Sequence, residues 1–275
     1  MAGNNPQTGY APVNGLEMYY EIHGEGRPTL LLHGAYGTIG LFGDLIPGLA
    51  AGRQVIAVEQ QAHGRTVDID RPIRYETMAD DCAALLGHLG VAQADVVGYS
   101  MGANVALRLA IQHPDLVRRQ VILSGNYRMD AYYPDLRAFF KTLTPDFFAG
   151  TPIEEGYKAV APDPDAFPAM VAKVIDLDHQ DFDWTDEMQA IRAPTLVVCG
   201  DADAFAPEHA IETLRALGGG APGEYIEGNP NAQLAILPNT AHIGVVMRPE
   251  RLLTLIPPFL DAPAPEPDRR KDEST

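Results

Sequence analysis

The sequence predicts an α/β protein, a mostly parallel sheet with helices on both faces. Two observations lead to this prediction. Short, continuous apolar runs recur along the chain, as in strands that are buried on both faces. Between them, apolar residues follow the helical repeat, and strands that alternate with helices form parallel sheets. The predicted strands cover residues 28–34, 53–59, 94–100, 118–125, 193–200 and 232–238, after an early hairpin strand at 15–24.

The predicted helices lie between these strands. Residues 75–89 place Met78, Cys82 and Leu85 on one helical face. The segment 101–112 has helical spacing and ends before His113-Pro114, where proline disfavours further helix. Residues 207–217 and 249–260 show the same repeat.

The segment 126–190 breaks the alternation. It is rich in aromatic residues, is interrupted by prolines and contains no clear strand. Because ligands bind at the carboxyl edge of open α/β sheets, we expect this segment to form a helical cap, inserted after the sixth strand, over that edge. We therefore expect a core of residues 1–125 and 191–261, a cap of 126–190 and a disordered tail of 262–275.

Composition limits the kinds of partner and cofactor that we expect this chain to bind. The 275 residues carry a net charge of −17, which disfavours nucleic acid and anionic lipid. The sequence shows no bilayer-spanning run and no signal peptide, so a cytoplasmic monomer or homodimer acting on a small molecule is expected. Cys82 and Cys199 fit buried thiols in a reducing compartment. Zinc, phosphate-loop and dinucleotide motifs are absent from the sequence, so we expect no metal and no cofactor.

The stretch G-Y-S-M-G at 98–102 is the strongest local signal. Ser100 is one of only three serines, and it follows a predicted buried strand and precedes a predicted helix. A turn this sharp brings neighbouring backbone close, and Gly98 and Gly102 remove the side chains that would clash. This is the pattern of a nucleophile elbow.

In this pattern and in the order of its elements, the chain resembles the α/β-hydrolase fold family over about residues 10–261. The resemblance implies that Ser100 is the nucleophile of a cofactor-free serine hydrolase. A serine here argues against the dehalogenases and epoxide hydrolases of this fold, which use aspartate.

The family order of serine, acid and histidine implies the other two catalytic residues. Two aspartates follow the strand that ends at Gly200; the family pattern selects Asp203, with Asp201 as the alternative. His242 follows the last predicted strand and is implied as the base, oriented by Asp203.

The oxyanion hole requires two backbone donors. Met101 supplies one at the start of the helix after Ser100. The loop H-G-A-Y-G at 33–37 resembles the family's H-G-x-x-G loop, which implies Ala35 as the second donor and His33 as a loop-holding residue. In E-Q-Q-A-H-G-R-T, Glu59 departs from the usual aspartate, and a structural hydrogen-bonding role is the better interpretation.

The expected reaction is hydrolysis of a carboxylic ester or lactone. A short resemblance at 59–66, together with the aromatic cap, suggests the serine-type macrolide esterases. Carbon–carbon bond hydrolysis, enol-lactone hydrolysis and a non-catalytic ligand receptor remain alternatives. Expected substrate-binding residues are Tyr36, Tyr99, Phe139, Phe140 and Trp184.

Overall fold

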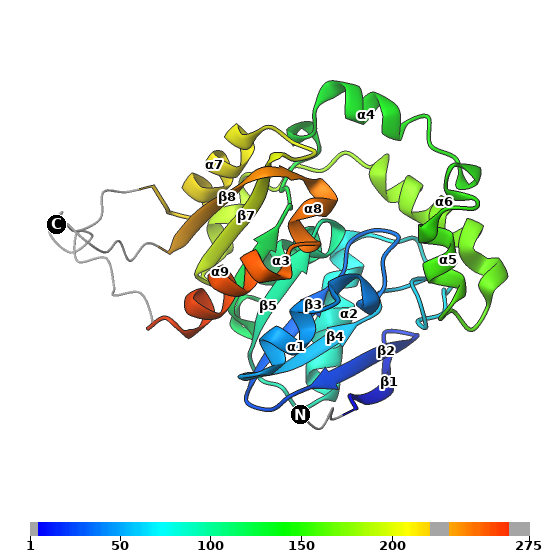
Figure 1. Cartoon of the computed structure of the whole chain (residues 1–275), viewed down its shortest axis with the longest axis horizontal. Coiled ribbons are helices and arrows are strands. Elements are labelled where there is room, and N and C mark those ends of the chain that lie inside the picture. The colour runs from blue at the N-terminus through cyan, green and yellow to red at the C-terminus, as the bar shows by residue number, and fades with distance from the viewer. Residues whose placement is uncertain (1–4, 221–230, 264–275) are drawn as a thin grey trace, which may run out of the picture.

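The computed structural model describes residues 5–220 and 231–263 and shows one eight-stranded sheet (Figure 1). The strand order is β1-β2-β4-β3-β5-β6-β7-β8, and all neighbours from β4 to β8 are parallel. The strands are β1 Gln7–Val13, β2 Leu16–His23, β3 Arg27–Leu32, β4 Arg53–Val58, β5 Ala94–Tyr99, β6 Val117–Leu123, β7 Thr195–Ala202 and β8 Ala232–Ala241. The predicted fold class and all seven predicted strands are therefore confirmed.

The two edges of the sheet differ from the sequence prediction. β1 pairs antiparallel with β2, and its apolar residues were too few to give a strand signal. β8 was predicted from a continuous apolar run, which is typical of a strand buried on both faces. It is instead an edge strand of mixed exposure, with the Ile236 side chain 38% exposed. Edge strands are covered on fewer sides, so apolar content alone does not predict their burial.

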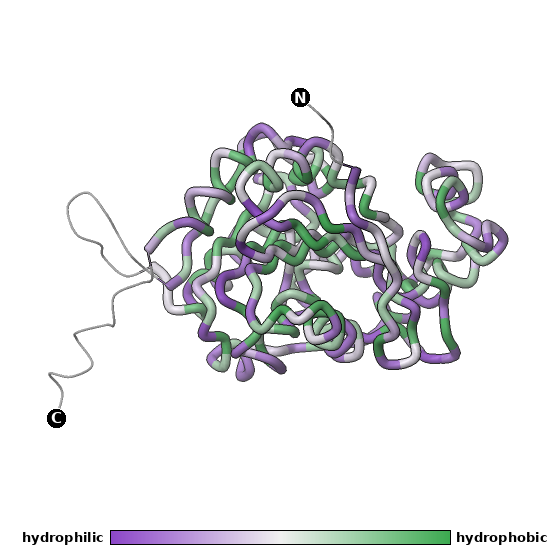
Figure 2. Tube along the Cα trace, turned by 90° about the horizontal axis from the view of Figure 1, so that it is seen from below, coloured by the Kyte–Doolittle hydropathy of each residue, from purple (hydrophilic) through white to green (hydrophobic). Residues whose placement is uncertain are grey.

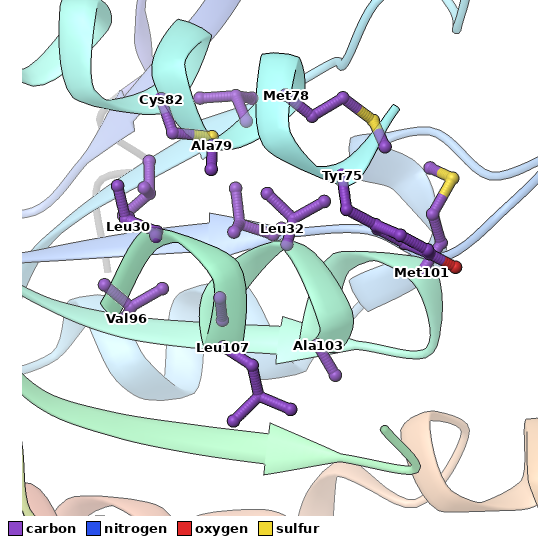
Figure 3. Packing of buried hydrophobic residues seen from close by; sticks show 14 of the residues in the cluster. Leu30, Leu32, Tyr75, Met78, Ala79, Cys82, Val96, Met101, Ala103 and Leu107 are labelled. Carbon is purple, nitrogen blue, oxygen red and sulfur yellow. The ribbon is translucent and has the colours of Figure 1, made fainter. Parts of the chain in front are cut away.

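Helices cover both faces of the sheet. One face carries α2 Tyr75–His88, α3 Met101–Gln112 and α7 Pro207–Ala216, whose buried side chains join one apolar cluster. Figure 3 shows part of it, where Cys82 and Met78 of α2 lie over Leu30 and Leu32 of β3. The opposite face carries α1 Leu45–Ala50, α8 His242–Val246 and α9 Pro249–Asp261. The hydropathy view shows the apolar strands in the middle of the molecule (Figure 2).

A helical insertion of residues 126–190 joins β6 to β7. It contains α4 Pro134–Phe140, α5 Pro152–Lys158 and α6 Phe167–Asp178. In Figure 1, α4 lies at the top of the molecule, and α5 and α6 lie at its right. Proline starts α4 and α5, where its missing N–H costs no helical hydrogen bond.

The two ends of the insertion pair with each other. We call this pairing the neck, residues 127–129 and 182–184. Met129 N–H donates to the Phe182 carbonyl at 2.9 Å, and Trp184 N–H donates to the Tyr127 carbonyl at 2.9 Å. An isolated antiparallel bridge joins Arg128 and Asp183 between them. The insertion therefore leaves and re-enters the core at one point.

Cys82 and Cys199 are both buried and free. Across residues 5–220 and 231–263, no helix has the length and apolarity to cross a bilayer, and no group of His, Cys, Asp or Glu could hold a metal ion. The tail prediction for 264–275 falls outside the described residues.

Candidate active site

Ser100 stands at a strained turn between β5 and α3. Its backbone has φ 53° and ψ −121°, a region that L-residues rarely occupy. The Ser100 N–H donates to the Leu123 carbonyl of β6 at 2.8 Å, which ties the turn to the sheet. A Cβ at Gly98 would lie 2.2 Å from the Gly102 carbonyl oxygen, and one at Gly102 would lie 2.2 Å from the Leu32 carbonyl oxygen. Both glycines are thus required by backbone contact, as the sequence pattern predicts.

The structure brings Ser100, His242 and Asp203 together. The His242 Nε2 lies 2.9 Å from the Ser100 Oγ, and the His242 Nδ1 lies 2.6 Å from an Asp203 carboxylate oxygen. An ionised carboxylate can only accept, so the Nδ1 carries the proton and the Nε2 is free to accept from the serine hydroxyl. The His242 side chain is 31% exposed, so water can reach this pair.

Asp203 is buried and held by several donors besides His242. The Gly200 N–H donates to it at 3.0 Å, the Ala204 N–H at 2.7 Å and the Ser124 hydroxyl at 2.7 Å. Burial alone raises the pKa of Asp203, but the hydrogen bond and charge of His242 and the other donors hold that pKa below its ordinary value. The carboxyl therefore stays ionised while it orients the imidazole.

Sequence analysis did not single out Ser124 among these donors. It follows β6 as Ser100 follows β5, and it shares the same positive φ of 53°. The available signal was its place: it is one of three serines, and it is followed by Gly125 at the end of a predicted strand.

Asp201, the alternative acid, occupies a different place. Its carboxylate accepts the N–H groups of Asn239 and Thr240, each at 2.9 Å, and these bonds lower its pKa. It is exposed and holds the end of β8, directly before His242. The geometry thus favours Asp203 as the partner of His242.

The loop 33–37 packs directly against Ser100. A Cβ at Gly34 would lie 2.9 Å from the Tyr99 ring and 3.1 Å from the Ser100 Cβ. Ala35 is the next residue along this loop. Tyr36 then adopts φ 61°, a second strained position at the same edge of the sheet.

Two buried histidines fix this loop. The His33 Nδ1 donates to the Gly34 carbonyl at 2.8 Å, which leaves its Nε2 to accept the Gln60 N–H at 3.1 Å. The His63 Nδ1 donates to the Gln61 carbonyl at 2.8 Å, and its Nε2 accepts the Tyr36 N–H at 3.2 Å. Both rings are therefore neutral and act as loop-holding groups, which agrees with the role expected for His33.

Burial lowers the pKa of His33 to about 3 and that of His63 to about 4. Between an unfolded pKa of about 6.5 and these folded values, the unfolded chain takes up protons that the folded chain does not. The stability that each neutral ring contributes is thus fully present above about pH 6.5 and is lost as the pH falls toward 4.

His63→Gln is therefore expected to flatten the pH dependence of stability. From about pH 6.5 down to 4, the free energy of unfolding of the variant should fall by about 1 kcal/mol less per pH unit than that of wild type. The reason is that the variant takes up one proton fewer on unfolding. Urea unfolding at several pH values measures this slope. The exposed His88→Gln serves as control, and equal slopes in wild type and His63→Gln would contradict the assignment.

Glu59 is fully buried and joins the same loops. It accepts the Arg65 N–H at 2.5 Å, the Arg65 guanidinium at 2.8 Å and the Ile39 N–H at 3.4 Å. A Cβ at Gly64 would lie 2.3 Å from its carboxylate. These contacts favour the structural role over a catalytic one.

The five expected substrate-binding residues fall in different surroundings. The buried Tyr99 donates its hydroxyl to the His242 carbonyl at 3.3 Å, and Tyr36 packs its ring 4.5 Å from that of Phe148. Phe140 is half-buried against Tyr132, and Phe139 is exposed.

Trp184 is 4% exposed and packs on Phe182 and Tyr75. This placement favours core packing over substrate contact for Trp184. For the other four residues, substrate contact stays a prediction.

The structure shows two clefts. One, of about 230 Å³, is lined by Thr38, Ile39 and Arg65. The other, of about 380 Å³, borders the neck and includes Met129, Asp181 and Asp183. Neither is lined by Ser100, Asp203 or His242.

The fold and this constellation define a hydrolase of the α/β fold. Residues 28–177 match the family model described as the alpha/beta hydrolase fold, and the chain belongs to that family.

Known relatives agree with this membership. The chain is 29% identical over 264 residues to the RutD protein of Azorhizobium caulinodans, to which carbamate hydrolysis is attributed; the match covers 88% of this chain and 94% of RutD. Among solved structures, an esterase from Thermogutta terrifontis superposes with a TM-score of 0.72 at 23% identity, covering 94% of this chain and 98% of the esterase. The enol-lactonase of Burkholderia xenovorans superposes with a TM-score of 0.70 at 21% identity, covering 92% and 100%.

Proposed function

We propose that the chain is a serine hydrolase that cleaves carboxylic esters or lactones through an acyl-enzyme intermediate. The observation that carries the proposal is the hydrogen-bonded series from Asp203 through His242 to Ser100, with 2.6 Å and 2.9 Å between partner atoms. A serine hydroxyl is a weak nucleophile until a base takes its proton, and this series supplies that base.

The proposed reaction runs in two halves. The Ser100 Oγ attacks the substrate carbonyl while the His242 Nε2 takes the proton of the serine hydroxyl. The oxyanion that forms accepts hydrogen bonds from the backbone N–H groups of Ala35 and Met101. Collapse of the intermediate expels the alcohol, which receives the proton from His242. Water then attacks the acyl-enzyme, His242 takes a proton from that water, and this proton returns to Ser100 as the acid leaves.

Esters and lactones fit this machinery better than amides. An alkoxide leaves more readily than an amine, and His242 is the acid that the proposed site supplies for the leaving group. Large macrocyclic lactones are the finer candidate within this class, supported by the short resemblance at 59–66 and the aromatic insertion. Carbon–carbon and enol-lactone hydrolysis would use the same three residues.

The test is steady-state turnover of p-nitrophenyl esters of increasing acyl length, small lactones and one macrolide. We expect turnover of at least one ester, with a fast release of p-nitrophenol where deacylation is slow. The profile then shows how large an acyl or lactone group the site accepts. If no ester or lactone turns over, the ester assignment fails, and a carbon–carbon substrate or a receptor role takes its place.

A further inference from the structure

Lys173 of α6 ties the insertion to the core segment 68–71, which lies between β4 and α2. Its ammonium donates to the Ile69 carbonyl at 2.6 Å and to the Arg71 carbonyl at 2.9 Å, and it pairs with the Asp68 carboxylate at 2.6 Å. An ammonium has three protons, so each of them has an acceptor here. The Lys173 and Asp68 side chains are both 26% exposed, and solvent screens such a pair less than one at the open surface.

Gln61 holds the same segment from the side of the core. Its side chain is fully buried, and its amide nitrogen donates to the Asp68 carboxylate at 2.9 Å and to the Arg71 carbonyl at 2.8 Å. Its Oε1 accepts from the Arg71 guanidinium at 2.7 Å and 2.9 Å. Lys173 and Gln61 therefore share two acceptors, the Asp68 carboxylate and the Arg71 carbonyl.

The backbone of Gln61 continues this series of contacts to the oxyanion loop. Its carbonyl accepts from the His63 Nδ1 at 2.8 Å, and the His63 Nε2 accepts the Tyr36 N–H at 3.2 Å. Tyr36 directly follows Ala35, the proposed second oxyanion donor. A continuous set of hydrogen bonds thus joins α6 of the insertion to the loop 33–37.

We propose that Lys173 is a positioning residue for the oxyanion hole, because it holds the segment 68–71 that supports the loop of Ala35. This inference rests on the proposed hydrolase function. Without the ammonium, the Asp68 carboxylate would lose its cation, and two backbone carbonyls would each lose a donor. The segment and Gln61 would then shift, and a displaced oxyanion donor stabilises the tetrahedral intermediate less well.

The first test is the steady-state kinetics of Lys173→Met on the shortest p-nitrophenyl ester that wild type turns over. Both halves of the reaction pass through an oxyanion, so kcat should fall by roughly tenfold while KM stays within about twofold of wild type. Asp176→Asn is the matched control, because it breaks the 2.7 Å pair with Arg74 from the same helix but leaves segment 68–71 untouched. Its kcat should stay within about twofold of wild type. If Lys173→Met does not fold, Lys173→Gln, which keeps a neutral donor, takes its place.

The second test measures hydrogen exchange of the Tyr36 amide and requires no turnover. Loss of the Lys173 ammonium should speed this exchange by roughly tenfold, because the hydrogen bond to His63 opens more often. Asp176→Asn should leave the exchange rate of this amide as in wild type.

The outcomes separate this inference from the proposed function. A rise in KM at unchanged kcat would mean that Lys173 only docks the insertion, and an equal loss of kcat in Asp176→Asn would mean that any loosening of α6 suffices. Either result overturns the inference and leaves the hydrolase standing. If wild type turns over no ester, the proposed function fails and hydrogen exchange decides: equal rates at Tyr36 in wild type and Lys173→Met overturn the inference, and faster exchange in Lys173→Met alone supports it.

Discussion

Ser100→Ala is expected to lower kcat for p-nitrophenyl esters by roughly 10⁴-fold or more, with the fold intact. The substitution removes the only atom that forms the acyl-enzyme in the proposed reaction. The strained backbone at φ 53° is retained, because alanine has the same Cβ as serine. A fluorophosphonate should label wild type at Ser100 and leave the variant unlabelled in mass spectrometry.

Ser124→Ala is the matched control for this experiment. Ser124 has the same φ and ends the neighbouring strand, but its hydroxyl contacts Asp203 at 2.7 Å rather than the substrate side of His242. Loss of one hydrogen bond to a carboxylate should lower kcat by roughly tenfold. A Ser100→Ala variant that kept a tenth of wild-type kcat would exclude Ser100 as the nucleophile.

Asp203→Asn is expected to lower kcat by roughly 10⁴-fold with little change in KM. An asparagine amide facing the His242 Nδ1 would donate instead of accept. The imidazole would then carry its proton on the Nε2, where it could no longer take the proton of Ser100. Steady-state kinetics of the same p-nitrophenyl esters measures this loss.

Asp201→Asn distinguishes the two candidate acids. Its carboxylate holds the backbone of Asn239 and Thr240, so the variant should show a lower Tm and less than about tenfold loss of kcat. If Asp201→Asn lost more activity than Asp203→Asn, the assignment of the acid would have to be reversed.

The central parallel strands could be predicted because burial on both faces imposes continuous apolar runs. G-Y-S-M-G at 98–102 predicted its turn for a steric reason that the structure reproduces at Gly98 and Gly102. β1 escaped prediction because its strand character depends on pairing with β2 rather than on its own residues. Sequence spacing predicts structure that residues close along the chain determine. The edge strands of the sheet depend instead on contacts with residues far away in the sequence.

Some residues of the proposed site could likewise be predicted from the sequence, and others could not. Ser100 and His242 follow strands in the chain, so their position could be inferred from order. The Ser124 hydroxyl donates a hydrogen bond to Asp203, which lies 79 residues further along the chain, and no local sequence pattern predicts that contact.

The neck makes the connection between the insertion and the core independent of the helices in the insertion. Its two ends are already paired through residues 127–129 and 182–184, so the core meets the same short ribbon whatever lies between. Closing a longer flexible segment across fixed ends costs only about 0.6 kcal/mol for each doubling of its length. A change in the length of the insertion between these paired ends should therefore put little strain on the strands that precede Ser100, Asp203 and His242.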